Sequence, residues 1–256
     1  MKLPSSYDVV GDILVFAEFP KMSETKERKI AEQLLRLHKN LKVICKKTRN
    51  YGGRYRLPRL KILAGDRRKE TLHKENGCRL KLHVENVYFS PRLGTERQRI
   101  NQLVKKNESV LVMFSGCGVY PINIARNTKA KEIYGIEINP VAHRYAEENL
   151  RLNKSGNITL LGGDVRKIIP HLHKKFDRII MPLPKSAETF LDLAVPKIKK
   201  KGIIHLYLFI REENINNNYL ENFLRPYLPR STIKSVVKCG QFGPGKCRIC
   251  VDIQIF

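Results

Sequence analysis

The sequence predicts an α/β protein with a doubly wound, mostly parallel, Rossmann-like sheet and a small α+β domain at its N-terminus. Three observations predict this fold. Short apolar runs alternate with helical patterns from about residue 109 onward, which is the order of a parallel sheet with helices on both faces. A glycine turn follows the first run and an acid follows the second. The 256 residues, 42% of them hydrophobic, suffice for one large or two small domains, and we expect domains at 1–100 and 101–256.

The first hundred residues read as a mixture of short strands and one helix. Ser23 is a polar residue of the kind that caps a helix, and apolar residues then recur at helical spacing. The expected elements are a strand pair within 1–20, a helix from Ser23 to about His38, a strand at 41–45, a glycine-hinged basic loop at 46–56, a strand pair at 60–64 and 70–73, and a half-buried strand at 77–84. Thr95 is expected to cap a further helix.

The charge is strongly positive, because 49 Lys and Arg residues oppose 24 Asp and Glu residues, which gives +25. Residues 42–106 hold 19 basic and 5 acidic residues, a net of +14, so more than half of the excess lies in a quarter of the chain. Such a field attracts nucleic acid, and tyrosines in the basic loop can stack on splayed RNA bases. The alternatives are a bias in overall composition and a plainly solvated surface.

The chain shows no apolar run of membrane-spanning length and no signal-peptide pattern. Its six scattered cysteines suit a reducing compartment, and we expect a cytoplasmic protein. Cys247 and Cys250 with Cys239 offer three thiolates but no fourth ligand nearby, and alternation along a final strand explains them more simply. No metal is therefore expected. His205 is flanked by apolar residues and is interpreted as a packing histidine.

The second half opens with a candidate cofactor site. An apolar run at 110–114 leads into Gly116 and Gly118, and a helical segment and a second apolar run end on Glu137. Glycines let a ligand approach the backbone, and an acid at this spacing can accept both hydroxyls of a ribose. The third glycine of a dinucleotide fingerprint is absent, which favours a nucleoside without phosphates, most commonly S-adenosylmethionine. The alternative is an ordinary buried βαβ unit.

Later strand ends support the cofactor interpretation. Asp164 follows a third strand, where it can accept from an adenine amino group, and Val165 would pack on the ring. Pro182 follows a fourth strand at 176–181. Ligands of doubly wound sheets bind at the carboxyl ends of strands, where all these residues are expected. The remaining expected elements are helices at 141–152, 187–199 and 214–224 and strands at 203–209, 233–238 and 249–256.

A set of segments, in order, resembles a known family. The segments are His73 to Arg79, Tyr88-Phe89-Ser90-Pro91-Arg92, Thr95-Glu96-Arg97, Met113 to Gly116, Gly135 to Pro140, Gly163 to Arg166, Leu183-Pro184-Lys185 and Gly202 to His205. They are similar to those of the archaeal and eukaryotic type of tRNA (guanine-37-N1)-methyltransferase, including its archaeal wyosine-pathway branch. The resemblance implies an α/β methyltransferase domain and a small N-terminal domain that holds the anticodon loop.

The resemblance also implies roles for individual residues. Glu96 matches the family's general base, Arg56 the arginine that faces the guanine oxygen, and Tyr88 the residue that orders the flipped base. The implied S-adenosylmethionine contacts are Arg97, Phe114, Gly116, Gly118, Glu137, Ile138, Asp164, Val165 and Pro182, and the implied substrate contacts are Arg54, Arg92, Pro184 and Lys185. These residue types suit the reaction, since the N1 proton must leave to a base while negative charge grows on O6. The base must also leave its stack.

Three departures from the family pattern affect the predicted substrate. Val112 stands where an acid is usual, and Pro182 replaces the asparagine of an Asn-Leu-Pro motif. The second change resembles the branch that methylates 4-demethylwyosine at position 37. The domain that reads the tRNA elbow in longer members is not found, so recognition is expected to depend on the anticodon stem-loop and on positive charge.

We expect a monomer that binds tRNA but neither DNA nor membranes. Transfer of a 3-amino-3-carboxypropyl group and a non-catalytic RNA-binding homologue are the alternative functions.

Overall fold

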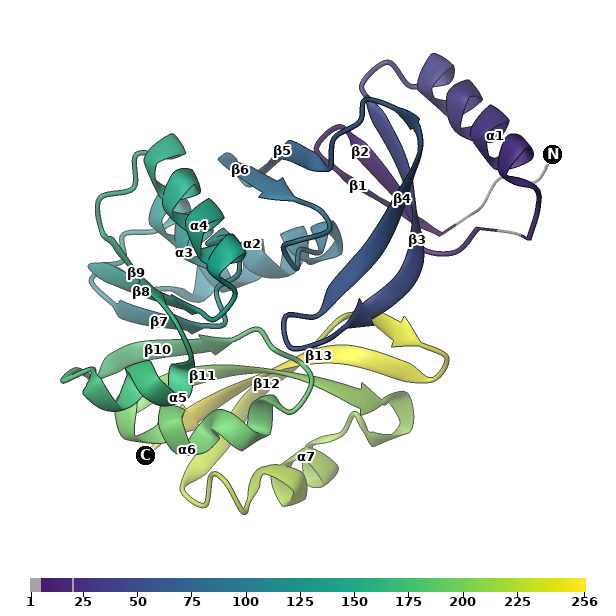
Figure 1. Ribbon diagram of the computed structural model, residues 1–256. Coiled ribbons are helices and arrows are strands. Elements are labelled where there is room, and N and C mark those ends of the chain that lie inside the picture. Colours follow the sequence, from purple (N-terminus) through teal and green to yellow (C-terminus); the bar gives the residue numbers. More distant parts are fainter. Residues whose placement is uncertain (1–5, 20) are drawn as a thin grey trace.

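The structure, a computed structural model, describes residues 6–19 and 21–256 and contains two sheets of unequal size (Figure 1). The larger sheet has seven strands in the order β12-β13-β11-β10-β7-β8-β9. Five neighbours, from β11 to β9, run parallel, and β13 and β12 continue the sheet antiparallel. The strands are β7 (Ser109–Met113), β8 (Glu132–Glu137), β9 (Ile158–Gly162), β10 (Phe176–Met181), β11 (Ile198–Arg211), β12 (Ser231–Gly243) and β13 (Lys246–Ile255). The predicted doubly wound, mostly parallel fold is confirmed.

Helices cover both faces of this sheet because its inner strands are apolar on both sides. In β7, Leu111 and Met113 pack with one core, whereas Val110 and Val112 pack with another. The first core includes residues of α5 (Val165–Ile168), α6 (Leu191–Ala194) and α7 (Asn217–Leu224), and the second includes residues of α2 (Gly94–Leu103) and α3 (Val119–Asn127). Strands buried on both faces are typical of parallel sheets. α4 (Pro140–Leu152) lies beside α3 on the same side (Figure 1).

The small N-terminal sheet has the order β1-β2-β3-β4. Its strands are β1 (Tyr7–Val10), β2 (Ile13–Phe16), β3 (Val43–Gly52) and β4 (Leu57–Gly65), and α1 (Glu24–Leu37) connects the parallel strands β2 and β3. Ile30, Ala31 and Leu34 of α1 are buried against Leu14 and Phe16 of the sheet. This arrangement confirms the small α+β domain. Leu37, the last residue of α1, is apolar but 67% exposed.

Two expectations about the basic region are wrong. Residues 46–52 continue β3 as an extended strand and pair with β4, so the expected basic loop is the end of a long hairpin with its turn at 53–56. The glycines mark the turn, but alternating charged residues on an exposed hairpin show no apolar pattern that would reveal a strand. β5 (Glu70–Glu75) pairs with β6 (Cys78–His83) and not with β4.

Two helix expectations are also corrected. The expected helix at 187–199 is interrupted, because α6 is flanked by 3-10 turns at Ala187–Phe190 and Val195–Lys197. Pro196 has no N–H to continue a helix there, and β11 then begins at Ile198. Thr95 does not cap α2, which begins at Gly94 with Leu93 in the capping position.

The β5–β6 hairpin is held against α4 by side-chain amides. The Asn149 Oδ1 accepts from the Lys81 N–H at 2.7 Å, and its Nδ2 donates to the Lys81 carbonyl at 2.9 Å. Asn153 makes the same pair of bonds with Arg79. The free edge of β6 is thus satisfied by asparagines in place of a neighbouring strand. This docking brings Glu75 against α2 and α3, where it bonds to Arg97 and Asn123.

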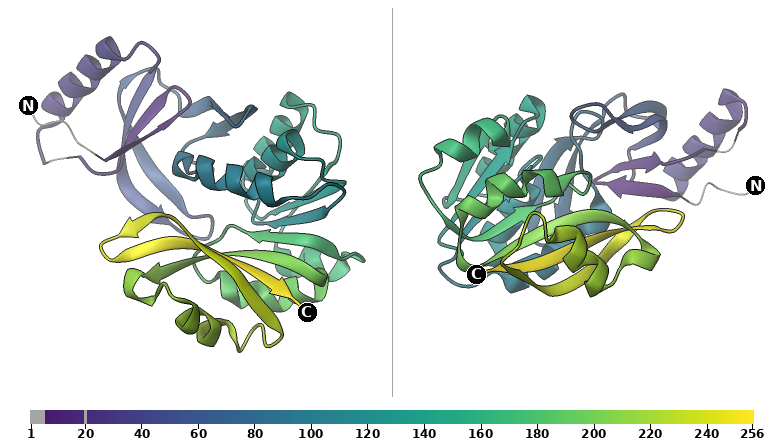
Figure 2. Two further views of the ribbon diagram at one scale, coloured as in Figure 1. Left: turned by 180° about the vertical axis from the view of Figure 1, so that it is seen from behind. Right: turned by 90° about the horizontal axis from the view of Figure 1, so that it is seen from below.

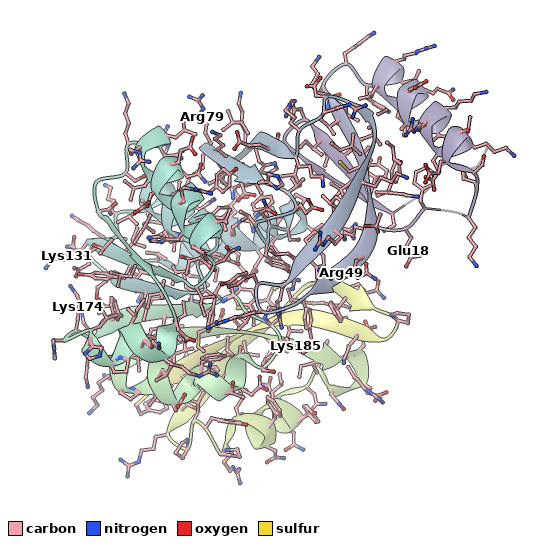
Figure 3. All side chains as sticks on the ribbon, viewed as in Figure 1. Glu18, Arg49, Arg79, Lys131, Lys174 and Lys185 are labelled. Carbon is pink, nitrogen blue, oxygen red and sulfur yellow. The ribbon has the colours of Figure 1, made fainter. Side chains whose placement is uncertain are left out.

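The long β3–β4 hairpin crosses to the C-terminal part of the protein. The left view of Figure 2 shows its end beside the large sheet, close to the C-terminal strands. Lysine and arginine side chains, among them Arg79 and Lys131, project from the outside of the molecule (Figure 3). Within residues 6–19 and 21–256, no helix is long and apolar enough to cross a membrane.

Candidate functional site

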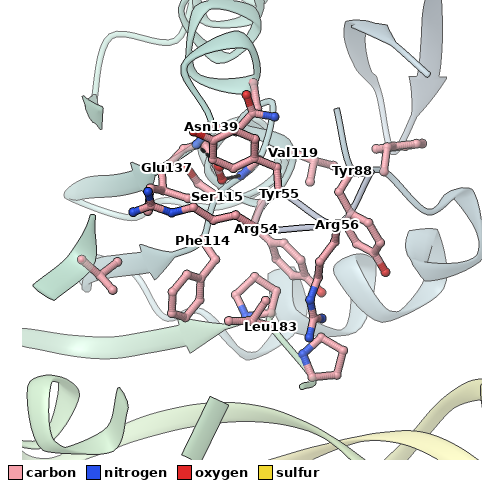
Figure 4. A pocket seen from close by; sticks show the side chains of 18 of the residues that line it. Arg54, Tyr55, Arg56, Tyr88, Phe114, Ser115, Val119, Glu137, Asn139 and Leu183 are labelled. Atoms are coloured by element: carbon pink, nitrogen blue, oxygen red, sulfur yellow. Dashed lines mark hydrogen bonds between the residues drawn. The ribbon is translucent and has the colours of Figure 1, made fainter. Parts of the chain in front are cut away.

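A cavity of about 330 Å³ lies at the carboxyl ends of β7, β8 and β10. The tip of the β3–β4 hairpin forms its other wall. Glu137 and Ser115 lie at one end of the cavity, and Arg56 and Tyr88 lie at the other (Figure 4). The lining residues are Arg54, Tyr55, Arg56, Tyr88, Phe89, Ser90, Leu93, Arg97, Phe114, Ser115, Gly116, Val119, Tyr120, Glu137, Ile138, Asn139, Ala142, Gly163, Asp164, Val165, Arg166, Pro182, Leu183, Pro184 and Phe190.

The glycine turn places backbone donors at the cavity. Phe114 and Gly116 both have left-handed backbones, with φ of 62° and 58°, so the chain reverses directly after β7. The Gly116 N–H donates to Glu137 Oε2 at 2.7 Å. Gly118 does not line the cavity; a Cβ there would lie 3.2 Å from Ala146 and Ile122, so this glycine allows α3 to pack against α4.

Glu137 is held by backbone N–H groups at both of its oxygens. Oε2 accepts from Gly116, and Oε1 accepts from the Asn139 N–H at 2.7 Å. Burial raises the pKa of Glu137, and the N–H donors of Asn139, Gly116 and Ile138 oppose that effect. Each carboxylate oxygen has a second lone pair. The side chain can therefore accept two further hydrogen bonds, as the neighbouring hydroxyls of a ribose require.

The part of the cavity around Phe114 is apolar and contains one carboxylate, that of Asp164. The Phe114 and Phe190 rings meet edge to face at 5.0 Å, and Ile138 and Val165 lie on the same cavity wall. Asp164 Oδ1 caps α5 through the Arg166 N–H at 2.9 Å. Its Oδ2 faces only Arg54, at 3.4 Å, and the Arg54 side chain is 67% exposed. Asp164 can thus accept from a ligand amino group beside an aromatic slot.

Arg97 is buried beside the cavity and has one carboxylate partner. Its Nε and Nη2 donate to the two oxygens of Glu75, each at 2.5 Å, and Nη2 also donates to the Ser90 carbonyl at 3.1 Å. Glu75 was not among the predicted site residues. Although burial raises its pKa, hydrogen bonds from His73 and Arg97 lower the pKa of Glu75 to about 2. The pair holds a positive charge at the cavity wall in a defined orientation.

The Glu75–Arg97 pair predicts a specific dependence of stability on pH. Because the folded-state pKa of Glu75 is below the ordinary value of 4.5, its stabilisation is complete above pH 4.5 and is lost as the pH falls toward 2. Glu75→Gln leaves Arg97 buried without a charge partner and should lower the free energy of unfolding by about 3 kcal/mol at pH 7. Urea unfolding should show this difference shrinking below pH 4.5, while the exposed control Glu221→Gln behaves as wild type. A difference that does not vary with pH would contradict the assigned ion pair.

Arg56 and Tyr88 lie together at the opposite end of the cavity (Figure 4). Arg56 has a left-handed backbone, with φ of 52°, and its Nη2 donates to the Lys185 carbonyl at 3.4 Å. Desolvation lowers the pKa of Arg56, an effect that the Tyr88 hydroxyl opposes and the charge of Arg248 reinforces. Tyr88 packs edge to face on Tyr51 at 5.3 Å, and its hydroxyl accepts from Arg248 Nη2 at 3.0 Å. A guanidinium and a phenol thus face the same part of the cavity.

Three more of the predicted residues do not line the cavity. Arg92 donates to Asp8 at 2.6 Å, outside the cavity, and Lys185 contributes its carbonyl to Arg56. The Glu96 carboxylate is buried and accepts from Arg99 and, at 2.7 Å, from the Tyr207 hydroxyl. Its role as a base stays a prediction.

Two tyrosine hydroxyls link Glu96 to Tyr120, a residue that lines the cavity. The Tyr120 hydroxyl donates to the Tyr207 hydroxyl at 3.0 Å, and Tyr207 in turn donates to Glu96. Tyr120 lines the cavity. Neither tyrosine was predicted, since only folding brings β11 and α3 beside α2.

His205 is buried, as predicted, but it bonds to charged neighbours in addition to packing. Its Nδ1 lies 2.6 Å from Asp252 Oδ1, and its Nε2 lies 2.6 Å from Arg178 Nη1. Cys250 lies near enough to complete a three-ligand cluster with His205 and Asp252. Because Arg99 also donates to Asp252 at 2.7 Å, the cluster is already neutralised by arginines and does not favour a cation. Cys247 and Cys250 are both buried in β13, as the structural interpretation of these cysteines expected.

Phe190 and Asn139 are among the cavity residues that were not predicted. Phe190 lies in a 3-10 turn after β10, and no periodic pattern identified it. Asn139 caps α4 by accepting from the Val141 N–H at 3.0 Å, and its Nδ2 donates to the Asn86 carbonyl at 2.8 Å. An asparagine before Pro140 at a helix start was the available signal for this position.

Sequence comparison matches both parts of the chain to one group of proteins. The profile of the TRM5/TYW2 methyltransferase domain matches residues 71–229, and that of the TYW2 N-terminal domain matches residues 1–68. Trm5b of Pyrococcus abyssi, a tRNA (guanine(37)-N(1))-methyltransferase, is 42% identical over 99% of this chain and 76% of its own length. Taw22 of Nanoarchaeum equitans, a tRNA (guanine(37)-N(1))/4-demethylwyosine(37)-methyltransferase, is 36% identical over 84% of this chain and 88% of its own.

Solved structures agree with this assignment. The aTrm5 chain of a complex with tRNALeu superposes with a TM-score of 0.88 at 32% identity, covering 99% of this chain and 73% of that one. The match extends over both the N-terminal sheet and the seven-stranded sheet. On these grounds the chain belongs to the TRM5/TYW2 methyltransferase family.

Proposed function

We propose that this protein transfers a methyl group from S-adenosylmethionine to N1 of guanosine 37 in tRNA. The observation that carries the proposal is the two-ended cavity. One end has the carboxylates and apolar walls for a nucleoside cofactor, and the other has Arg56 from the turn of the basic hairpin and Tyr88. Relatives that bear the name tRNA (guanine(37)-N(1))-methyltransferase support the choice of reaction and base.

The cavity residues fit S-adenosylmethionine, which supplies the methyl group. Glu137 would accept the ribose hydroxyls, Asp164 the adenine amino group, and Phe114, Ile138 and Val165 would enclose the ring. Arg97 keeps Nη1 available for the methionine carboxylate, because its other donors are held by Glu75 and Ser90. Pro182 and the backbone of Gly116 would close the slot.

The target base would occupy the end of the cavity beside Arg56. The Arg56 guanidinium can stabilise the negative charge that grows on O6 as the N1 proton leaves. Tyr88 would order the base after it has left its stack, and Pro184 lies on the cavity wall close to both. Arg54, Arg92 and Lys185 are proposed to contact the RNA around the base, since they supply exposed positive charge near the opening.

Glu96 is proposed as the base that finally receives the N1 proton. Because its carboxylate does not line the cavity, the proton either passes along the Tyr120 and Tyr207 hydroxyls or requires the Glu96 side chain to turn toward the substrate. Both routes remove the proton from the cavity. They differ in whether the Tyr207 hydroxyl is needed.

Methylation of 4-demethylwyosine at the same position is a second candidate activity. The observation that favours it is the pair Pro182 and Pro184, which gives this wall of the cavity no side-chain amide and leaves an apolar surface. A tricyclic base offers more apolar surface than guanine does. The name of Taw22 of Nanoarchaeum equitans covers both substrates.

The proposed partner is tRNA, held through its anticodon stem-loop. A structural relative was solved with tRNA, and the charge of +25 suits a polyanion. The expected monomeric state, the cytoplasmic location and the absence of DNA and membrane binding stay predictions.

The direct test is methyl transfer from labelled S-adenosylmethionine to two tRNA transcripts, one with guanosine and one with adenosine at position 37. We expect label on the guanosine transcript alone. Equal label on both would move the target site elsewhere. No label despite cofactor binding, followed by label on tRNA carrying 4-demethylwyosine, would make the second candidate the main activity. Absence of cofactor binding would leave the RNA-binding homologue, and transfer of label from the carboxypropyl chain alone would indicate aminocarboxypropyl transfer.

A further inference from the structure

The C-terminal β12–β13 hairpin presents an aromatic and cationic cluster beside the cavity. The Phe209 and Phe242 rings lie 3.9 Å apart with an interplanar angle of 30°, and the Arg248 guanidinium lies 5.4 Å from the Phe209 ring. We call Arg248, Phe209 and Phe242 the hairpin stack. Arg248 and Phe209 face each other across the β11–β13 ladder, and Phe242 lies at the hairpin end. Figures 1 and 2 show this hairpin next to the β3–β4 hairpin that carries Arg56.

Arg248 is a guanidinium without a neutralising partner. No carboxylate lies within 4.0 Å of it among residues 6–19 and 21–256, and its buried Nε has no hydrogen-bond partner. Among the described residues, its side chain makes one hydrogen bond, the 3.0 Å donation to the Tyr88 hydroxyl. Arg56 on the other side of Tyr88 also lacks a carboxylate in the described part of the chain. Two uncompensated guanidiniums around one phenol favour an anion between or beside them.

Phe242 is apolar surface that the protein itself does not cover. Its side chain is 60% exposed, although one side of the ring packs near Phe209. The residue belongs to a hairpin end that also contains Gly243 and Gly245, so the turn itself does not need an aromatic ring. Single-stranded RNA bases stack on exposed aromatic rings, and a nearby guanidinium can bind the RNA backbone.

We infer that the hairpin stack is a second nucleotide site, in which Arg248 binds a backbone phosphate and Phe242 stacks on the base of a nucleotide next to the target. The inference rests on the proposed function for the identity of the RNA. When the target base enters the cavity past Tyr88, its own phosphate and the following nucleotide would remain near Tyr88, which Arg248 contacts and to which Phe242 is connected through Phe209. A phosphate there would supply the anion that Arg248 and Arg56 lack, and a base on Phe242 would cover its exposed face.

The test measures the affinity of the full chain for a guanosine-37 tRNA transcript over a series of salt concentrations. Arg248→Gln should weaken binding and also lower the slope of log K against log salt by about 0.7 to 1, since one phosphate contact is lost. Phe242→Ala should weaken binding by about five- to 100-fold without changing the slope, because stacking releases no counterions. Two substitutions are the matched controls. Lys238→Gln removes a lysine of the same hairpin that is paired with Glu212, and Tyr219→Ala removes an exposed aromatic residue on α7.

A purely structural role for Arg248 gives a different result. If Arg248 only holds Tyr88, Tyr88→Phe should reproduce its effect, Arg248→Gln should add nothing in the Tyr88→Phe background, and the salt slope should stay that of wild type. That result would overturn the phosphate assignment, and unchanged affinity in Phe242→Ala would overturn the stacking assignment. Methyl transfer by the wild-type protein is measured separately. Its failure would reject the proposed reaction, whereas the binding slopes decide the hairpin stack by themselves.

Discussion

Glu137→Gln is expected to weaken S-adenosylmethionine binding by about 100-fold or more. The carboxylate offers two adjacent charged acceptors for the ribose hydroxyls and is held in place by two backbone N–H groups, and hydrogen bonds to a charged group contribute about 1.5–3 kcal/mol each. A loss of about 3 kcal/mol corresponds to about 100-fold. Glutamine also turns one acceptor into a donor, so the N–H of Gly116 or of Asn139 loses its partner. Isothermal titration calorimetry measures the change.

The matched control for this experiment is Glu147→Gln on α4. Glu147 has an exposed carboxylate that is not part of the cavity, so its removal alters net charge equally without touching the site. The control should bind S-adenosylmethionine as the wild type does. Equal affinity of Glu137→Gln and wild type would show that the ribose does not lie at the end of β8, and the cofactor orientation in the cavity would have to be reassigned.

Glu96→Gln is expected to reduce the rate of methyl transfer by about 10²- to 10⁴-fold while S-adenosylmethionine affinity stays unchanged. The amide cannot accept the N1 proton. Arg99 keeps its bond to Asp252 at 2.7 Å, so the buried charges around α2 remain partly paired and the fold should persist. Single-turnover rates with guanosine-37 tRNA measure the effect, and a thermal melt checks folding. Retention of the wild-type rate would remove Glu96 from the proton path.

Tyr207→Phe distinguishes the two routes to Glu96. If the proton passes along the Tyr120 and Tyr207 hydroxyls, the phenylalanine variant should lose about as much rate as Glu96→Gln. If Glu96 turns into the cavity, the variant should stay near the wild-type rate, because it frees the carboxylate from a 2.7 Å bond. Tyr134→Phe, on the other side of the sheet, serves as the matched tyrosine control.

The cofactor end of the cavity was largely predictable because its residues are local in sequence. Glu137 ends β8 and Asp164 lies two residues after β9, and parallel strands must bring their carboxyl ends to one edge. Apolar strand patterns therefore sufficed to place these side chains together. Gly118 was assigned to the same site but is used for helix packing, since a glycine pattern does not show which glycine meets the ligand and which meets a helix.

The substrate end depended on contacts between segments distant in sequence. The basic segment at 46–56 carries no pattern that shows it to be a hairpin reaching the far sheet, and Tyr88 meets Arg248 across 160 positions. The partners of Arg97 and of Glu96 could not be predicted either, because the sequence around a charged residue does not show which distant charge will pair with it. The family resemblance named Arg56 and Tyr88, but it did not indicate the hairpin stack.

The sequence by itself determined the class of the sheet, the alternation of strands and helices along the chain, and the sheet edge at which Glu137 and Asp164 lie. These features follow from hydrophobic periodicity and from the geometry of parallel strands, both of which are local. Only the tertiary structure decided which charges are buried as pairs, that Glu96 is bonded to Tyr207 and through it to Tyr120, and that Arg248 contacts Tyr88 and packs on Phe209 beside Phe242. Those features depend on packing between distant segments. Burial makes an unpaired charge costly, and packing decides which guanidiniums are paired and which remain available to a ligand.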